Sequence, residues 1–411
     1  MEGLTGWVKG ARLAGPVFLG LMALTGVFAR GLVNGCFVLL ALWGVFYLVT
    51  AKRGWFLAPK ALPAKLLWGA AIYFAALMLS ALAGSEYGRS FKHIVTVAYL
   101  LAPLPLTWLA LTQWPNLIKY LVPLYGLGLM AAGLMTFTEA GFGLSCVRAK
   151  ASLGIIELGA VLAQLTPIMA LATALAIRAR DRLKTVFFAA ALILAYVAHL
   201  NSCSRIAFLT TPVITLILLW AHRRVFTLTM KLVLVALALV LAIATLTNKR
   251  IVERFAEMGV EKGNYNNEVR INHWKQGWKV FQENPILGVG PRAIPNAPPL
   301  NNPAYPKEFT RTRDKYYHAH QVFITVLAES GVIGLIGFLA LHLAPIALLW
   351  PFRRDPDPER MFWVWAAIAV ASQLFFNGLT DNVFTLKPLM YIYWTVTGAA
   401  LWVTLGNKPA P

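Results

Sequence analysis

The chain has 411 residues, of which 58% are hydrophobic and 13% charged, and apolar runs of membrane-spanning length recur from end to end. This composition excludes a soluble enzyme and predicts an all-α, polytopic integral membrane protein, because spanning segments must satisfy their backbone groups internally. The formal net charge of +20 does not require nucleic acid as a partner, since basic cytoplasmic loops beside anionic membrane lipids explain it.

The apolar runs predict about twelve transmembrane helices and one large loop. The expected spans are about 13–29, 33–50, 66–83, 93–111, 118–138, 153–176, 185–200, 206–221, 228–247, 321–350, 361–380 and 386–405. Residues 1–248 would hold transmembrane helices 1 to 9, residues 249–320 the loop, and residues 321–411 helices 10 to 12. The first span is followed closely by a second, which indicates a retained helix rather than a signal peptide.

Short connectors rich in Lys and Arg orient the chain. They lie near residues 52–65, 178–184, 223–224 and 353–360, all on one side of the membrane. By the positive-inside rule this side is cytoplasmic, so both termini are expected in the cytoplasm and the loop 249–320 in the periplasm.

The outer side also carries basic residues that this rule does not explain. The large loop holds twelve Lys and Arg against seven Asp and Glu, and shorter outer segments hold Arg89, Lys92 and Arg148. Attraction to phosphate would explain them, although contact with lipid headgroups is the more ordinary interpretation for Arg89, Lys92 and Arg148.

Arg205 stands between two predicted spans, near membrane depth, in the run Asn-Ser-Cys-Ser-Arg. Arginine is costly beside hydrocarbon and usually marks a partner or a pathway, and no carboxylate close in sequence accounts for this one. A bound anion would explain it, and contact with lipid headgroups is the alternative. Cys203 in the same run, Cys36 and Cys146 all lie near predicted outer ends, where a disulfide between two of them is permitted, but buried free thiols are the commoner case.

The large loop contains one predicted helix, over about 268–282. Its apolar stripe is formed by Ile271, Trp274, Trp278 and Phe281, and lysines lie opposite, as in a helix along the outer membrane interface. We expect Asn267 to cap this helix, Asn284-Pro285 to end it, and Gly288-Val-Gly290-Pro291 to turn the chain away. Arg270 falls in the first turn, where the helix dipole disfavours a cation, so a bound anion or lipid headgroups would explain it.

Two histidines precede the span that starts near 321. His320 lies at its positive end, where the helix dipole and nearby arginines favour a neutral imidazole that can act as a general base. A plain interfacial or capping histidine is the alternative. His318 and His320 also suggest a metal pair, but zinc needs further Cys, His or carboxylate ligands, and the neighbouring sequence offers mainly Arg, Lys and Tyr.

Carboxylates on the outer side are few. There is no Asp-x-Asp pair of the kind that holds a divalent cation beside a diphosphate, which predicts chemistry without a metal. Asp381, in the short turn Gly378-Leu-Thr-Asp-Asn, either orients a histidine or an arginine or caps the next helix.

Several of these motifs together resemble the O-antigen ligase and polymerase superfamily. They are Ser204-Arg205, the Arg270-x-x-x-Trp274 helix ending in Asn284-Pro-x-x-Gly288-x-Gly290, and His320-Gln321 followed by Gly331-x-x-Gly334, within a chain of about twelve spans. The motifs occupy about 200–335. Gln321 stands where the family often has asparagine, a departure that the pattern tolerates.

The resemblance implies an inverting, metal-independent glycosyltransferase without cofactors. His320 corresponds to the family's essential histidine, and Arg205 and Arg270 to its two essential arginines. The implied donor is a glycan on undecaprenyl diphosphate, and in the ligase branch the acceptor is a sugar hydroxyl of lipid A-core at the periplasmic face of the bacterial inner membrane. Arg89, Lys92, Arg148, His318 and Asp381 are further candidates for substrate binding.

Three alternatives stay open. An O-antigen polymerase would use the same donor with a second lipid-linked glycan as acceptor. A protein O-oligosaccharyltransferase usually carries an added periplasmic domain after the last span. A lipid-linked glycan flippase or anion transporter would also need arginines, but at mid-span beside broken helices.

Overall fold

The computed structural model describes residues 2–50, 56–59, 61–144, 147–223, 247, 249, 252–253, 265–297 and 318–406. In these ranges the chain is helical and contains no β-strand. The helices in order are α1 (Glu2–Thr25), α2 (Arg30–Thr50), α3 (Ala64–Ala83), α4 (Tyr87–Leu101), α5 (Pro103–Gln113), α6 (Ile118–Glu139), α7 (Ile155–Arg178), α8 (Arg182–Ser202), α9 (Arg205–Ala221), α12 (Tyr265–Glu283), α14 (Val322–Leu349), α15 (Pro358–Gly378) and α16 (Lys387–Leu401). Short 3-10 turns and a final π-helical turn (Trp402–Gly406) complete the described part.

This architecture is that of an all-α, multi-pass membrane protein. Among the described residues, 10 helical segments are long and apolar enough to cross a membrane, and α9 adds a shorter apolar helix. The predicted span at 228–247 lies outside the described residues, apart from position 247. The span predicted at 93–111 is divided into α4 and α5 at Ala102, because Pro103 begins the second helix and cannot donate a backbone hydrogen bond.

Two helices form the centre of the bundle. α7 and α16 are buried on nearly all sides, as expected for helices that are apolar all round. Around them, α3 packs on α14, α8 on both α6 and α7, α9 on α7 and α15, and α5 on α16. Many leucines and valines of the peripheral helices, such as Leu48 and Leu183, remain exposed and form an apolar outer surface.

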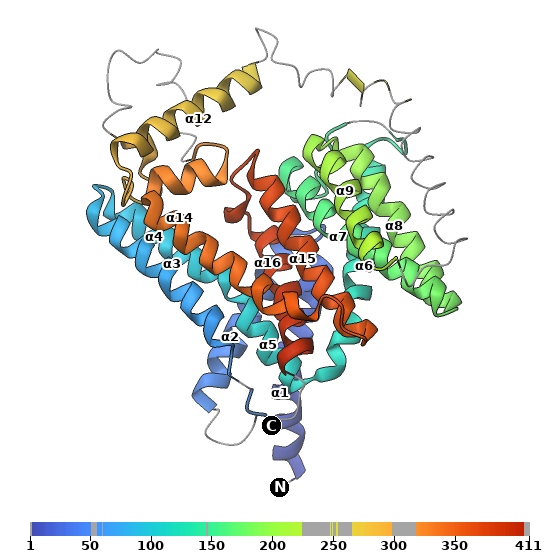
Figure 1. The fold of residues 1–411 in the computed structure, drawn as a ribbon. Helices are drawn as coiled ribbons and strands as arrows, with labels where there is room; N and C mark the ends of the chain where they lie inside the picture. The colour runs from blue at the N-terminus through green and yellow to red at the C-terminus, as the bar shows by residue number, and fades with distance from the viewer. Residues whose placement is uncertain are drawn as a thin grey trace.

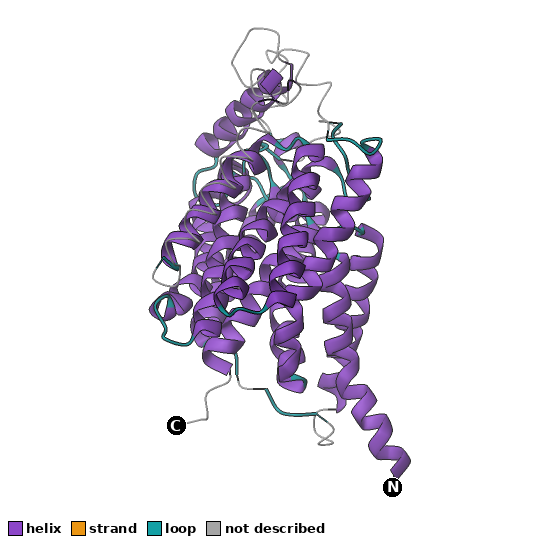
Figure 2. Ribbon diagram, turned by 90° about the vertical axis from the view of Figure 1, so that its right-hand side faces the viewer, coloured by secondary structure: helices purple, strands orange, loops and turns teal. Residues whose placement is uncertain are grey.

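α12 lies across the end of the bundle opposite the start of α1 and the end of α16 (Figures 1 and 2). It begins at Tyr265, so Asn267 lies inside the helix and the predicted cap there is wrong. It ends at Glu283, immediately before Asn284-Pro285, as the sequence predicts.

The face of α12 that packs on α14 differs from the predicted stripe. His273, Gly277 and Val280 are the buried positions, and Gly277 contacts Ile324 and Ala319 at the start of α14. Trp278 is instead 47% exposed. Trp274 is half-buried and its Nε1 donates to the carbonyl of His320 at 3.4 Å, so the predicted stripe is divided between the protein and the outer surface.

The cysteines differ in whether their thiols are free or form a disulfide. Cys203 is disulfide-bonded and Cys36 is a free thiol, while Cys146 lies outside the described residues. Cys203 has a left-handed backbone and ends α8 immediately before the Ser204–Arg205 turn. The disulfide therefore adjoins the corner from which α9 starts.

Candidate active site

His320 is held in place by the residues that start α14. The side chain of Gln321 caps the helix by accepting from the backbone N–H of Ile324 at 2.5 Å. The Thr325 hydroxyl donates to the carbonyl of Gln321 (2.7 Å) and accepts from the N–H of Ala319 (3.1 Å). His320 itself has φ 53, a left-handed conformation that costs a non-glycine residue free energy and is often found at functional sites.

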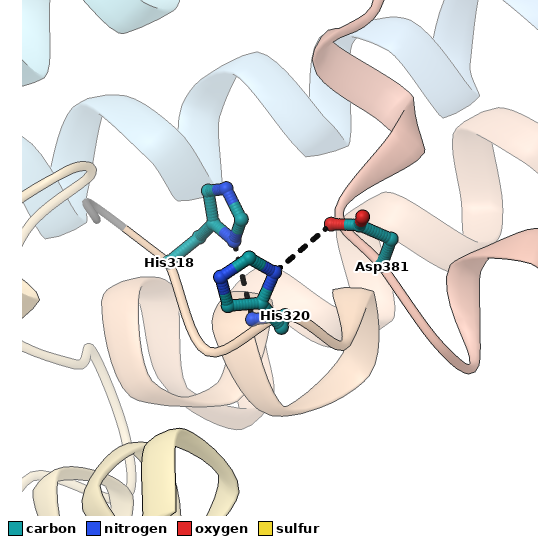
Figure 3. Close-up of side chains that lie close together, drawn as sticks. All are labelled: His318, His320 and Asp381. Atoms are coloured by element: carbon teal, nitrogen blue, oxygen red, sulfur yellow. Dashed lines mark hydrogen bonds and ion pairs between the residues drawn. The ribbon is translucent and has the colours of Figure 1, made fainter. Parts of the chain in front are cut away.

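Asp381 fixes the orientation of the His320 ring. The distance from His320 Nδ1 to Asp381 Oδ1 is 3.2 Å (Figure 3). Oδ1 also accepts from the backbone N–H of Asn382 at 2.8 Å. A carboxylate only accepts, so Nδ1 carries the proton and the lone pair of the neutral ring is on Nε2. Of the two interpretations of Asp381 left open by the sequence, the one in which it orients a histidine is the one seen.

Two further imidazoles surround His320. His273, on α12, stacks on it with ring centroids 5.2 Å apart and planes 5° from parallel. His318 is edge-on at 4.5 Å, and its Nδ1 accepts from the backbone N–H of His320 at 3.1 Å. Burial, together with repulsion by His320 when that ring is protonated, lowers the pKa of both His273 and His318 to about 4, so both rings are neutral at pH 7.

The carboxylate of Asp381 is ionised in this setting. Burial alone would raise its pKa, but the hydrogen bond and charge of His320 outweigh this effect and lower it. An ionised Asp381 is suited to stabilise the imidazolium that forms when Nε2 takes up a proton.

Arg270 reaches the same turn from α12. Its Nη1 donates to the carbonyl oxygen of Thr380 at 2.9 Å, next to Asp381. Because only this one hydrogen bond from the guanidinium is found among the described residues, several of its five N–H donors are left to bind an anion. His320 and Arg270, 50 positions apart in sequence, therefore meet at the turn between α15 and α16.

His318, His320 and Asp381 also form a possible cation site, since one ligand atom from each lies within 4.8 Å of the others. Two histidines and a carboxylate are ligands that zinc accepts in catalytic sites. The sequence argument that a third ligand was missing nearby is therefore wrong, because Asp381 is brought in from another helix. In the present arrangement, however, Nδ1 of both rings is engaged in hydrogen bonds within the protein.

α14 is interrupted just beyond the site. Gly331 has φ 63 and ψ −164, a conformation that essentially only glycine adopts. Four backbone hydrogen bonds join the break to residues 285–290: Val289 N to Ala328 O (3.1 Å), Gly290 N to Glu329 O (2.9 Å), Val332 N to Pro285 O (2.9 Å) and Ile333 N to Ile286 O (3.4 Å). The segment Gly288–Pro291 thus docks against α14, and Gly288 (φ 68) and Gly290 (φ 102) have the turn conformations expected where the chain leaves the direction of α12.

Arg205 and Arg148 lie at a second position, the corner between α8 and α9. Arg205 opens α9, and Gly159 on α7 permits the close approach of this corner, since a Cβ there would lie 2.3 Å from Cβ of Ser204. The segment after exposed Arg148 is joined to the corner by the N–H of Ala149, which donates to the carbonyl of Asn201 at 2.9 Å. α9 packs on α15, which leads to the Thr380–Asp381 turn, but convergence of Arg205 with His320 stays a prediction.

Arg89 and Lys92 lie on the first turns of α4 and are exposed. Arg89 is paired with Glu86 at 3.7 Å, a surface contact of small energetic value. Between them, Ser90 donates to the carbonyl of Pro291 at 3.0 Å, which brings this helix end against the docked segment. Binding of substrate by Arg89 or Lys92 stays a prediction.

Sequence reasoning missed two site residues, His273 and Arg292. His273 follows Arg270 by three positions, so both fall on one face of a helix, and this spacing could have indicated it. Arg292 directly follows the docked segment, and its charge contributes to the lowered pKa of His318. Its position could not be read from sequence, because it depends on the docking of residues 285–290.

Comparison with known families gives one match. Residues 188–339 match the family model described as O-antigen ligase. The matched stretch contains Arg205, Arg270, Arg292 and His320, but ends before Asp381. No curated protein matches the chain.

Proposed function

Through residues 188–339 this chain belongs to the O-antigen ligase superfamily of membrane enzymes, and on that premise we propose that it transfers O-antigen glycan from undecaprenyl diphosphate to a sugar hydroxyl of lipid A-core. Transfer would take place at the periplasmic face of the bacterial inner membrane, with neither metal nor cofactor. The observation that supports this most is the His320–Asp381 hydrogen bond on the turn that Arg270 also contacts.

The chemistry follows from the two nitrogens of His320. Nε2 accepts the proton of the acceptor hydroxyl as that oxygen attacks the anomeric carbon, and Asp381 stabilises the resulting imidazolium through Nδ1. The bond between the anomeric carbon and the diphosphate oxygen breaks, and undecaprenyl diphosphate leaves with the bonding electrons. A single displacement of this kind inverts the configuration at the anomeric carbon.

The leaving group gains negative charge that must be stabilised without a metal. Arg270 lies at the turn that carries Asp381 and is suited to bidentate contact with phosphate oxygens. Arg205 is the second proposed guanidinium, on the basis of its motif and of its partly buried place at the start of α9. Arg89, Lys92 and Arg148 are proposed as weaker contacts to the donor.

The test is transfer by purified protein in lipid nanodiscs, with undecaprenyl-diphosphate glycan and lipid A-core in the presence of EDTA. His320→Ala should lower the rate by about 100-fold or more while donor binding is retained, because a general base contributes on this scale. His222→Gln, at the far end of α9, serves as the control and should stay active. Normal transfer by His320→Ala, or strict dependence on Mg²⁺ or Zn²⁺, would refute the mechanism.

The choice of acceptor separates the neighbouring activities. Product formed only with lipid A-core supports a ligase, whereas product formed from donor alone supports a polymerase, and glycosylation of a pilin supports a protein transferase. Movement of donor across liposomes without any product would instead support a transporter.

A further inference from the structure

The backbone of Arg292 is fixed from several sides. Its φ of 59 is left-handed, and its backbone N–H lies close to the carboxyl group of Glu329. Before it, Pro291 accepts from Ser90 Oγ at 3.0 Å on α4, and Gly290 donates to the carbonyl of Glu329 on α14. Residue 292 is therefore presented from a rigid support rather than from a mobile loop.

Arg292 lies among buried residues, and few negatively charged groups are near enough to balance the positive charge of its guanidinium. Its neighbours Pro291 and Ala293 are buried, and the Arg292 side chain itself is partly buried. Among the described residues, its guanidinium makes no hydrogen bond and no ion pair within 4.0 Å. Such a cation is expected to have a partner, because partial burial removes water that would otherwise solvate it.

Three titratable groups lie within electrostatic reach of the Arg292 guanidinium: Glu329, His93 and His318. Glu329 is the only group among them with a carboxyl side chain, and the backbone N–H of Arg292 also lies close to it. His318 belongs to the cluster around His320, so the Arg292 side chain acts on the same region as the proposed general base.

Of the two carboxyl groups near the site, Asp381 is engaged by His320, whereas Oε1 of Glu329 is buried without a hydrogen-bond partner among the described residues. Arg270 acts on this region from α12, and Arg292 from the residue that directly follows the docked segment. Both carry guanidinium N–H donors that are not used within the described residues. A ligand with two adjacent phosphate groups matches such a pair, since each guanidinium can bind one phosphate.

We propose that Arg292 binds the diphosphate of the lipid-linked donor beside Arg270. This proposal rests on the proposed function. It adds a donor-binding residue directly after the docked segment. It also gives the break in α14 a role, because the backbone of Glu329 and the conformation of Gly331 hold the segment that positions Arg292.

The experiment measures donor and acceptor dependence separately for Arg292→Ala and Arg292→Lys. Loss of a charge-assisted phosphate contact should raise the donor KM by about 10- to 100-fold, and the acceptor KM should stay within about twofold. Arg292→Lys should fall between wild type and Arg292→Ala, because it keeps the charge without the planar fork. Arg223→Ala, an exposed arginine at the other end of the bundle, should behave as wild type.

A purely structural role, in which Arg292 only balances Glu329, predicts a different result for the double variant Arg292→Ala/Glu329→Gln. If charge balance were the whole role, removing both charges would restore the donor KM, and the proposal would be overturned. The proposal expects no restoration. Thermal unfolding in detergent identifies any variant that does not fold, and Arg292→Gln then replaces Arg292→Ala.

Direct binding separates this proposal from the proposed function. Undecaprenyl diphosphate and inorganic pyrophosphate are titrated against wild type and Arg292→Ala. Equal affinity of both proteins for both probes overturns the role of Arg292 and leaves the transferase intact. A wild-type protein that binds neither probe and forms no product overturns the proposed function itself.

Discussion

Asp381 determines which nitrogen of His320 is able to accept a proton. Because its Oδ1 receives Nδ1–H, the lone pair of the neutral ring is placed on Nε2, and the negative charge of Asp381 favours the protonated intermediate. An aspartate in a short turn thus acts on a histidine that lies 61 positions earlier in the sequence.

Asp381→Asn should lower kcat for glycan transfer by about 100-fold or more with little change in either KM, because an amide can hold the wrong tautomer and carries no charge. Steady-state kinetics with both substrates varied measures this. The control is Asp181→Asn at the start of α8, where asparagine caps a helix as well as aspartate does. An Asp381→Asn variant with wild-type kcat would show that Asp381 does not support His320.

At this scale the sequence predicts the central residues well but not their neighbours. His320 and Arg270 could be recognised from the sequence because each is a polar residue at a helix end or at the membrane interface. At such a position a polar side chain without a functional role is unexpected. Asp381 could be identified as a candidate from the sequence, but its partner could not. An aspartate in a short turn can equally well cap the next helix or orient a histidine or an arginine. His273 and Arg292 gain their roles only through the packing of α12 and of residues 285–290 on α14.

The main finding at the scale of elements is the break in α14. Backbone groups of residues 328–333 that an unbroken helix would pair internally are paired instead with residues 285–290. Sequence patterns predict a continuous span from 321 to 350, because Gly331 and Gly334 are compatible with a membrane helix. The break could not be predicted without knowing that a distant segment supplies the replacement hydrogen bonds.

Gly331→Ala should destabilise the protein and reduce transfer. A Cβ at residue 331 would lie 2.2 Å from the carbonyl oxygen of Ile286, and the backbone conformation alone costs alanine about 1–3 kcal/mol. The midpoint of thermal unfolding in detergent and the rate of transfer are both measured. Gly35→Ala on α2, where nothing lies within 4 Å, is the matched control and should be neutral or stabilising. Equal stability of the two variants would argue against a rigid docked segment.

For the whole molecule, the all-α, multi-pass architecture follows directly from the length and spacing of apolar runs. What sequence patterns do not supply is the order of helices in space. α7 and α16, both central, look much like the peripheral helices in composition, and burial on all sides depends on how the bundle closes. The structure places α12 at the end opposite the start of α1 and the end of α16 (Figure 1), while the side of the membrane on which each end lies is a prediction from loop charges.

Cysteine labelling tests this orientation. In a Cys36→Ser background, a membrane-impermeant maleimide added to intact spheroplasts should label Trp278→Cys on α12. It should label Leu183→Cys at the start of α8 only after the membrane is permeabilised, since both positions are exposed and differ only in side. The reverse pattern would invert the topology and place His320 in the cytoplasm.

The pairing of residues 285–290 with α14 also bears on how the chain is made. The break in α14 depends on these contacts: in the broken conformation without residues 285–290, the N–H groups of Val332 and Ile333 would lack acceptors in lipid, at a cost of several kcal/mol for each group. Residues 285–290 leave the ribosome before α14 does, so their carbonyls are synthesised in advance of the donors that need them. A chain in which residues 285–290 fail to fold back is therefore expected to keep α14 as a continuous membrane helix, so the order of synthesis favours docking at the time when the break forms.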